Sequence, residues 1–123
     1  METINEVRSL LDNAFKQSVV AVRNKKILKA SKALNELDKL NNESVLIKNI
    51  RESYSRELLE RLQPTSINDD IMSYIALKSL NPEYESILKL FPSLEVKYQR
   101  FMESLRKDQD FEPFLRSLKQ AYE

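Results

Sequence analysis

The 123-residue chain contains no glycine. Glycine ordinarily makes up roughly 7% of a protein, and it supplies the positive φ angles of tight hairpin turns and the close backbone approach of phosphate-binding loops. Its absence argues against hairpin-rich β folds and against glycine-rich nucleotide sites. Helices tolerate the absence best, because asparagine can take the left-handed position that often follows a helix. We therefore predict an all-α protein in which Asn24, Asn41 and Asn81 end or join helices.

Histidine and cysteine are absent as well. Without them the chain has no Ser-His-Asp triad, no imidazole base and none of the usual zinc ligands apart from carboxylates. The acid pairs Asp69-Asp70 and Glu83/Glu85 fall in the first turns of predicted helices, where carboxylates offset the helix dipole. We therefore expect no enzymatic activity, no cofactor and no metal site. The alternative, an enzyme that uses carboxylates alone, would need acids from different helices to meet in one pocket.

Apolar residues recur three and four positions apart through most of the chain, which is typical of helices with one buried face. Thr3 followed by Glu6, and Ser66 followed by Asp69, have the spacing of N-terminal capping boxes. The predicted helices cover about residues 4–22, 25–40, 44–62, 67–80, 82–91, 94–105 and 113–118.

The joints between these helices carry further expectations. The apolar run from Val19 to Val22 ends the first predicted helix; it is either buried on all sides or a short irregular join, and we favour burial. Asn41-Asn42 is expected to close the second helix. Pro82 is expected at the first position of the fifth helix, and Pro92 is expected to break or kink that helix.

The predicted architecture is a single helical domain over residues 1–123, an antiparallel bundle or short stack of six to seven helices. Residues 1–62 form three longer helices, and the shorter, proline-jointed helices of residues 63–123 pack on them. The first part has 12 Lys and Arg against 9 Asp and Glu, and the second has 8 against 10. Eight of the ten aromatic residues lie in the second part, which is therefore acidic and aromatic where the first is basic and aliphatic.

Two surfaces are candidates for binding a partner. Large aromatic side chains dominate both protein cores and interface hot spots, so most of the aromatic residues are expected in the core. Three of them lie beside joints between short helices and are expected to remain available to a protein partner: Phe91, Phe111 and Phe114.

The second candidate is a basic stretch without acids near the start of the second helix, formed by Arg23, Lys25, Lys26, Lys29 and Lys32. Lys25, Lys29 and Lys32 share one helical face. Such a stripe can neutralise the phosphates of a nucleic acid, lie on an anionic membrane surface, or simply be solvated. No aromatic residue lies within it to stack on bases, which weakens the nucleic-acid interpretation.

Our leading hypothesis is a non-catalytic helical protein–protein interaction domain, an adaptor or subunit of a larger complex. A nucleic-acid-binding protein that uses the basic stretch is the alternative. No apolar run approaches the roughly 20 residues of a membrane span, and no signal-peptide pattern opens the chain, so we expect a cytoplasmic or nuclear protein. Helical N-terminal domains of longer trafficking or chromosome-associated proteins have this general appearance.

Overall fold

A computed structural model describes residues 3–40, 44–108 and 111–122, which form seven α-helices and no strand. The helices are α1 (Ile4–Phe15), α2 (Val20–Leu40), α3 (Ser44–Arg61), α4 (Ile67–Leu80), α5 (Glu85–Leu90), α6 (Pro92–Arg106) and α7 (Phe111–Tyr122). The predicted all-α class is confirmed.

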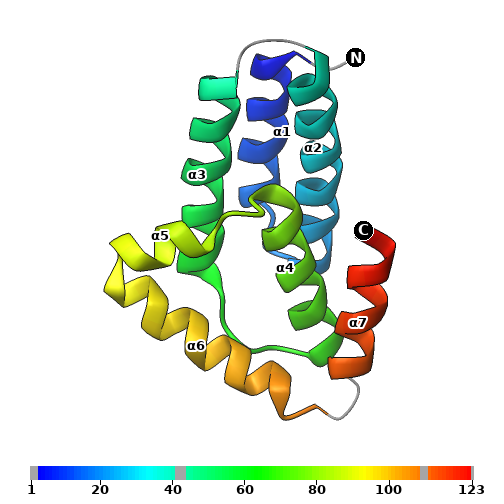
Figure 1. The fold of residues 1–123 in the computed structure, drawn as a ribbon, viewed down its shortest axis with the longest axis vertical. Helices are drawn as coiled ribbons and strands as arrows, with labels where there is room; N and C mark the ends of the chain where they lie inside the picture. Colours follow the sequence, from blue (N-terminus) through cyan, green and yellow to red (C-terminus); the bar gives the residue numbers. More distant parts are fainter. Residues whose placement is uncertain (1–2, 41–43, 109–110, 123) are drawn as a thin grey trace.

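The first three helices form the upper part of the molecule, where α2 runs antiparallel to both α1 and α3 (Figure 1). α4 rises beside them from below and packs along α2, which lies between α1 and α4. α5 and α6 meet at a sharp corner on the side of α3, and α6 then crosses below the bundle towards α7. The α5–α6 corner and α7 therefore lie on opposite sides of the molecule.

One hydrophobic core joins both parts of the chain. It extends from Val7 and Leu11 of α1 to Phe101 and Leu105 of α6, and it includes Phe111 at the start of α7. Each of these side chains is almost completely buried. Five aromatic residues of the second part therefore belong to the same core as the aliphatic residues of the first: Tyr74, Tyr84, Tyr98, Phe101 and Phe111.

The N-termini of α1 and α4 agree with the predicted capping boxes. The Thr3 hydroxyl accepts a hydrogen bond from the Glu6 amide at 3.2 Å, and the Ser66 hydroxyl accepts one from the Asp69 amide at 3.3 Å. These contacts satisfy amides that have no partner within the helix. Pro92 breaks the chain between α5 and α6 as expected and is the first residue of α6, where its missing N–H costs nothing. The expected place of Pro82 at the first position of the fifth helix is wrong, because α5 begins at Glu85.

The joint between α1 and α2 differs from the prediction. α1 ends at Phe15 rather than near Val22, and α2 begins at Val20. Val19 and Val22 are 57% and 39% exposed, so the expected burial of this run is wrong. Ser18 and the β-branched valines that follow are weak helix formers, and a turn at this point lets α2 reverse direction against α1.

Asparagine does not replace glycine in the expected way. Asn24 lies inside α2, fully buried, and Asn81 follows α4 with an extended φ of −145°. Asn41 and Asn42 lie outside the described residues, and none of the residues with a described backbone has a positive φ. The Asn81 side chain instead accepts the Glu83 amide and donates to the Ser55 hydroxyl, which fixes the turn between α4 and α5.

Cationic side chains from neighbouring helices satisfy the C-terminal carbonyls of three helices. Arg61 donates to the Phe15 carbonyl of α1 at 2.8 Å, and Lys97 donates to the Glu60 carbonyl of α3. Arg51 donates to the Leu80 carbonyl of α4 at 2.8 Å and to the Ser79 carbonyl at 3.3 Å. Without glycine at the positions after these helices, tertiary hydrogen bonds take over the role of local C-caps.

Replacing Arg51 by methionine is expected to lower the free energy of unfolding by about 2 kcal/mol, because two α4 carbonyls and the Asn35 amide oxygen lose a charged donor. Chemical denaturation measures this change. Lys48→Met, on the exposed surface of the same helix, is the control and is expected to change stability by less than about 0.5 kcal/mol. Equal stability of the two variants would show that Arg51 does not cap α4.

Candidate interaction surfaces

The acid pairs Asp69-Asp70 and Glu83/Glu85 lie at the starts of two different helices, α4 and α5. Asp70 is buried and accepts hydrogen bonds from the Thr65 amide and hydroxyl, both at 2.9 Å, so it holds the turn before α4. Glu83 and Glu85 are exposed near the start of α5. Among the described residues no group of three or more carboxylates is arranged to hold a metal ion. These acids therefore stabilise turns and helix ends where their contacts are described.

The expected availability of Phe111 is wrong. Only 1% of its surface is exposed, because its ring packs edge-on against Tyr74 of α4, with ring centroids 6.2 Å apart. The reason is its place at the first turn of α7, where the chain turns back towards α4. Phe114, one turn further along, is 36% exposed and remains accessible.

Phe91 lies at a different place from the other two. It separates α5 from α6 at their corner, whereas Phe111 and Phe114 lie on α7 at the opposite side of the molecule (Figure 1). The three phenylalanines therefore do not form one surface. The Phe91 ring is partly buried, and the Arg56 guanidinium of α3 lies 4.0 Å from its centroid in a cation–π contact.

The α5–α6 corner carries the exposed apolar surface nearest to Phe91. Leu90 is 74% exposed and Val96 is 51% exposed, with Pro92 also exposed between them in sequence. We use the name "corner surface" for Leu90, Phe91, Pro92 and Val96 together with Arg56. Helical spacing alone could have indicated Val96, since it lies on the opposite face of α6 from Leu94 and Tyr98. Nothing in the sequence distinguished Leu90 from the buried leucines around it.

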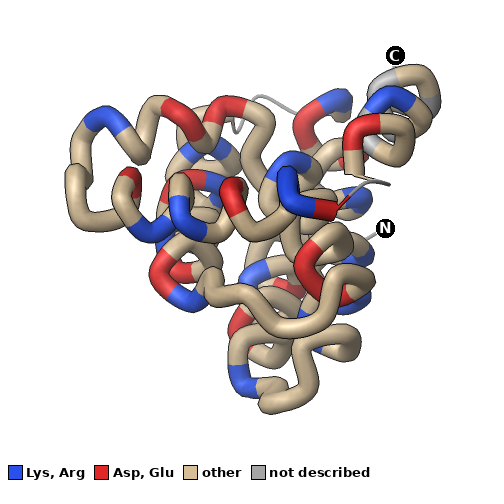
Figure 2. Tube along the Cα trace, turned by 90° about the horizontal axis from the view of Figure 1, so that it is seen from below, with Lys and Arg blue, Asp and Glu red and all other residues tan. Residues whose placement is uncertain are grey.

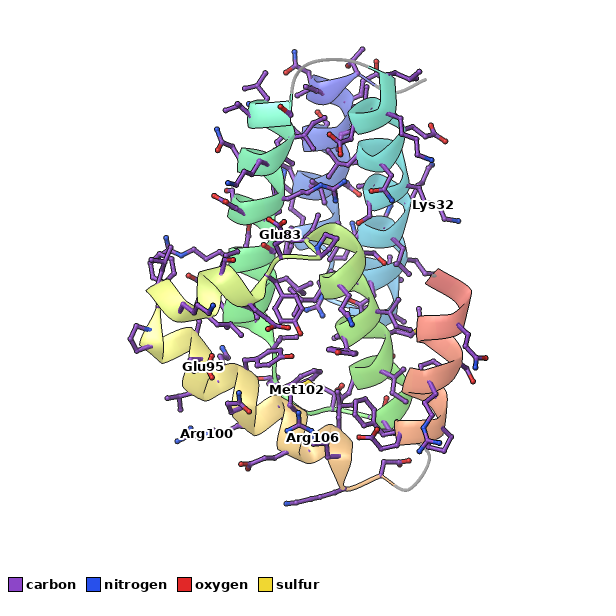
Figure 3. All side chains as sticks on the ribbon, viewed as in Figure 1. Lys32, Glu83, Glu95, Arg100, Met102 and Arg106 are labelled. Atoms are coloured by element: carbon purple, nitrogen blue, oxygen red, sulfur yellow. The ribbon has the colours of Figure 1, made fainter. Side chains whose placement is uncertain are left out.

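Buried contacts hold this corner in place. The hydroxyls of Tyr84 and Tyr98 are hydrogen-bonded to each other at 2.5 Å and join the approach to α5 with the middle of α6. Burial raises the pKa of both phenols, so both remain protonated around neutral pH. In Figure 3 Met102 points from α6 towards the interior, while Arg100 points away from the molecule. α6 is thus fixed to the core on one face and open on the other.

The basic stretch is reduced to four lysines. Lys25, Lys29 and Lys32 are exposed on α2 and Lys26 is half-buried, whereas Arg23 is only 7% exposed. Lys32 points outward from α2, away from the other helices (Figure 3). The expected role of Arg23 in binding an anionic partner therefore conflicts with its burial.

Arg23 is buried because it belongs to a polar cluster between α2 and α4. Its Nε and Nη2 donate to the Asn24 Oδ1 at 3.2 and 3.1 Å, and Nη2 also donates to the Ser73 hydroxyl at 3.1 Å. The Asn24 amide donates to the same hydroxyl at 2.9 Å. Burial lowers the pKa of Arg23, nearby Arg61 adds to this effect, and Asp69 opposes it. The oxygens that accept hydrogen bonds from this guanidinium are those of a neutral amide and a neutral hydroxyl.

The surface charges elsewhere are mixed. Seen from below, lysines and arginines alternate with acids rather than covering one side (Figure 2). The lower side of the molecule is thus mixed in charge, whereas the α2 lysines follow one another without an acid between them.

The described residues form an all-α fold with exposed apolar side chains at the α5–α6 corner and exposed lysines on α2. None of the described helices is long and apolar enough to cross a membrane. Comparison with protein-family models, with curated proteins and with solved structures finds no match to this chain.

Proposed function

We propose that this protein is a non-catalytic helical interaction domain that works as an adaptor or subunit of a larger protein complex in the cytoplasm or nucleus. Its partner binds the corner surface. The exposure of Leu90 and Val96 on either side of Phe91 is the observation that carries the proposal. Single exposed apolar residues are normal on protein surfaces. Here a leucine, a phenylalanine, a proline and a valine lie within seven residues at one corner, and three of them are exposed. Such a concentration of exposed apolar residues marks interaction sites.

The corner surface contains the residue types that dominate binding energy at interfaces. Arginine and aromatic side chains are enriched among interface hot spots, and Arg56 and Phe91 are stacked on each other here. Arg56 also lies 3.5 Å from Glu60 in an ion pair whose two side chains are about half exposed. An exposed pair of this kind contributes little to stability, so a partner can displace Glu60 at little cost.

The shape of the corner indicates the shape of its partner. α5 and α6 meet at the edge of the molecule and project from it (Figure 1). A projecting apolar corner fits into a concave site, so the partner is expected to offer an apolar groove that receives Leu90 and Val96. Because the Tyr84–Tyr98 hydrogen bond already fixes the corner, binding costs little additional ordering.

The double variant Leu90→Ser/Val96→Ser is expected to weaken partner binding by about 10- to 100-fold, since each exposed apolar side chain that becomes buried contributes on the order of 1 kcal/mol. The measurement is quantitative recovery of the partner by tagged protein, followed by titration with the purified partner. Folding of the variant is checked by circular dichroism, and it should be unchanged because both side chains point to solvent.

A matched control comes from α3, where Val45 and Leu46 form a second exposed apolar pair. The variant Val45→Ser/Leu46→Ser removes the same chemistry from another place and should keep full partner binding. Equal loss in both double variants would point to general surface hydrophobicity rather than to the corner. Full binding by the corner variant would refute the proposal.

A further inference from the structure

We propose that one face of α2 binds the surface of anionic lipid bilayers, independently of the corner surface. The α2 face consists of Val22, Lys25, Lys26, Lys29 and Lys32 of α2, together with Val19 in the turn just before the helix. It combines exposed cations with exposed apolar side chains at the start of a helix of 21 residues.

The cations of this face are available to a partner. The two ion pairs of the described residues, Arg56–Glu60 and Arg61–Glu57, both lie within α3. The side chains of the four α2 lysines therefore enter neither pair. No acid occurs from residue 13 to residue 35, and Glu36 marks the upper end of the basic face. An uncompensated group of lysines on one helix favours an anionic binding partner.

The apolar side chains distinguish a bilayer from a nucleic acid. Val22, Lys25, Lys29 and Lys32 follow each other at spacings of three and four residues, so they share one face of α2. Val19 is 57% exposed and lies at the turn that leads into this face. An exposed valine contributes no favourable binding free energy to a contact with the phosphate backbone of a nucleic acid. At a bilayer it can enter the boundary between lipid headgroups and acyl chains while the lysines contact the headgroups.

The remaining features also favour lipid over nucleic acid. Arg23, the only arginine of the basic stretch, is held inside by Asn24 and Ser73 and cannot make bidentate contacts with phosphate or base. Lysine is sufficient for a diffuse anionic surface, because such a surface is recognised by charge rather than by geometry.

The position of the α2 face leaves the corner surface free. Lys32 points away from the molecule on the side of α2, and the α5–α6 corner projects from the opposite side (Figures 1 and 3). A bilayer on one side and a protein on the other can therefore be bound at once. In this arrangement the domain would carry its partner to a membrane surface.

Vesicle flotation with the full 123-residue protein tests the inference. The vesicles consist of phosphatidylcholine alone or of phosphatidylcholine with phosphatidylserine. The protein is expected to float with the second kind at low salt and to be released at high salt. Each lysine near an anionic leaflet strengthens binding by about fivefold, so the triple variant Lys25→Glu/Lys29→Glu/Lys32→Glu is expected to bind at least about 100-fold more weakly.

The matched control has the same net charge as the triple variant. Lys48→Glu/Lys89→Glu/Lys107→Glu changes three exposed lysines outside the α2 face and should retain most of the vesicle binding. Val19→Ser/Val22→Ser should reduce binding severalfold without changing its salt dependence. All variants are checked for helical content and thermal unfolding, so that loss of the fold is recognised.

Several results would overturn the inference. These are absence of flotation with anionic vesicles at low salt, equal losses in the two triple variants, or unchanged binding after the valine substitutions. A gel shift with duplex DNA or RNA at salt concentrations that abolish vesicle binding would assign the lysines to nucleic acid instead. Partner binding through the corner surface is measured without lipid, so its failure and the failure of this inference are distinguishable.

Discussion

Phe111→Ala is expected to lower the free energy of unfolding by about 3–5 kcal/mol. Among the α7 side chains that the structure describes, Phe111 is the one that belongs to the core, where it is 1% exposed and packs against Tyr74. Alanine at this position leaves a cavity beside Tyr74 and removes an aromatic edge contact. α7 should then be released from α4 before the rest of the protein unfolds, and hydrogen exchange of the α7 amides measures this release.

Phe114→Ala separates this effect from a general loss of aromatic surface. Phe114 lies one turn away on the same helix and is more than a third exposed, so its replacement should cost less than about 1 kcal/mol. Both changes are measured by chemical denaturation with identical buffers. If the two variants lost equal stability, Phe111 would not be the anchor of α7, and its binding role as predicted from the sequence would need to be considered again.

The pair also shows what sequence periodicity can and cannot predict. Both phenylalanines lie beside a joint and three residues apart, so they share one face of α7. The pattern correctly indicates an amphipathic helix. It does not specify where the first turn of that helix meets α4, because this depends on how the chain turns after α6. One residue of the predicted binding surface is therefore part of the core.

The helix map was largely predictable because its signals are local. The bounds of α4 follow from Ser66 before it and Asn81 after it, and the break between α5 and α6 follows from Pro92. The break between α1 and α2 has no comparable local signal, such as a proline or a capping residue. Val19 and Val22 fit a continuous helix by their spacing, and only the packing of α2 antiparallel to α1 requires the turn.

The candidate site was less predictable than the fold. The position of Phe91 beside a proline and between short helices indicates a surface residue. Its apolar neighbours Leu90 and Val96 become candidates for partner binding only because the structure shows that they are exposed. Arg23 was assigned to the surface because it continues a run of lysines. Its burial depends on Ser73, which lies 50 residues further along the chain and reaches it only when α4 packs on α2.

Replacing Asn24 by leucine is expected to lower the free energy of unfolding by about 3 kcal/mol. The Asn24 Oδ1 accepts two of the three hydrogen bonds that the structure gives the Arg23 guanidinium, and leucine accepts none. A buried cation would then face an apolar side chain, which costs far more than the hydrogen bonds contribute on average. Asn49→Leu, on the exposed surface of α3, is the control and should be nearly neutral.

Asn24→Asp should largely preserve stability, because it places a carboxylate at the position that already accepts the Arg23 N–H groups. We expect its stability at neutral pH to lie within about 1 kcal/mol of the original protein, since charge pairing compensates for burial. The adjacent guanidinium lowers the pKa of this carboxyl in the folded state below its unfolded value of about 3.9. The contribution of the pair is therefore present above that pH and is lost as the pH falls through the folded pKa. Denaturation of the aspartate and leucine variants across acidic pH measures the difference, which should narrow towards low pH. A constant difference would show that the Arg23 cluster is not governed by its charge.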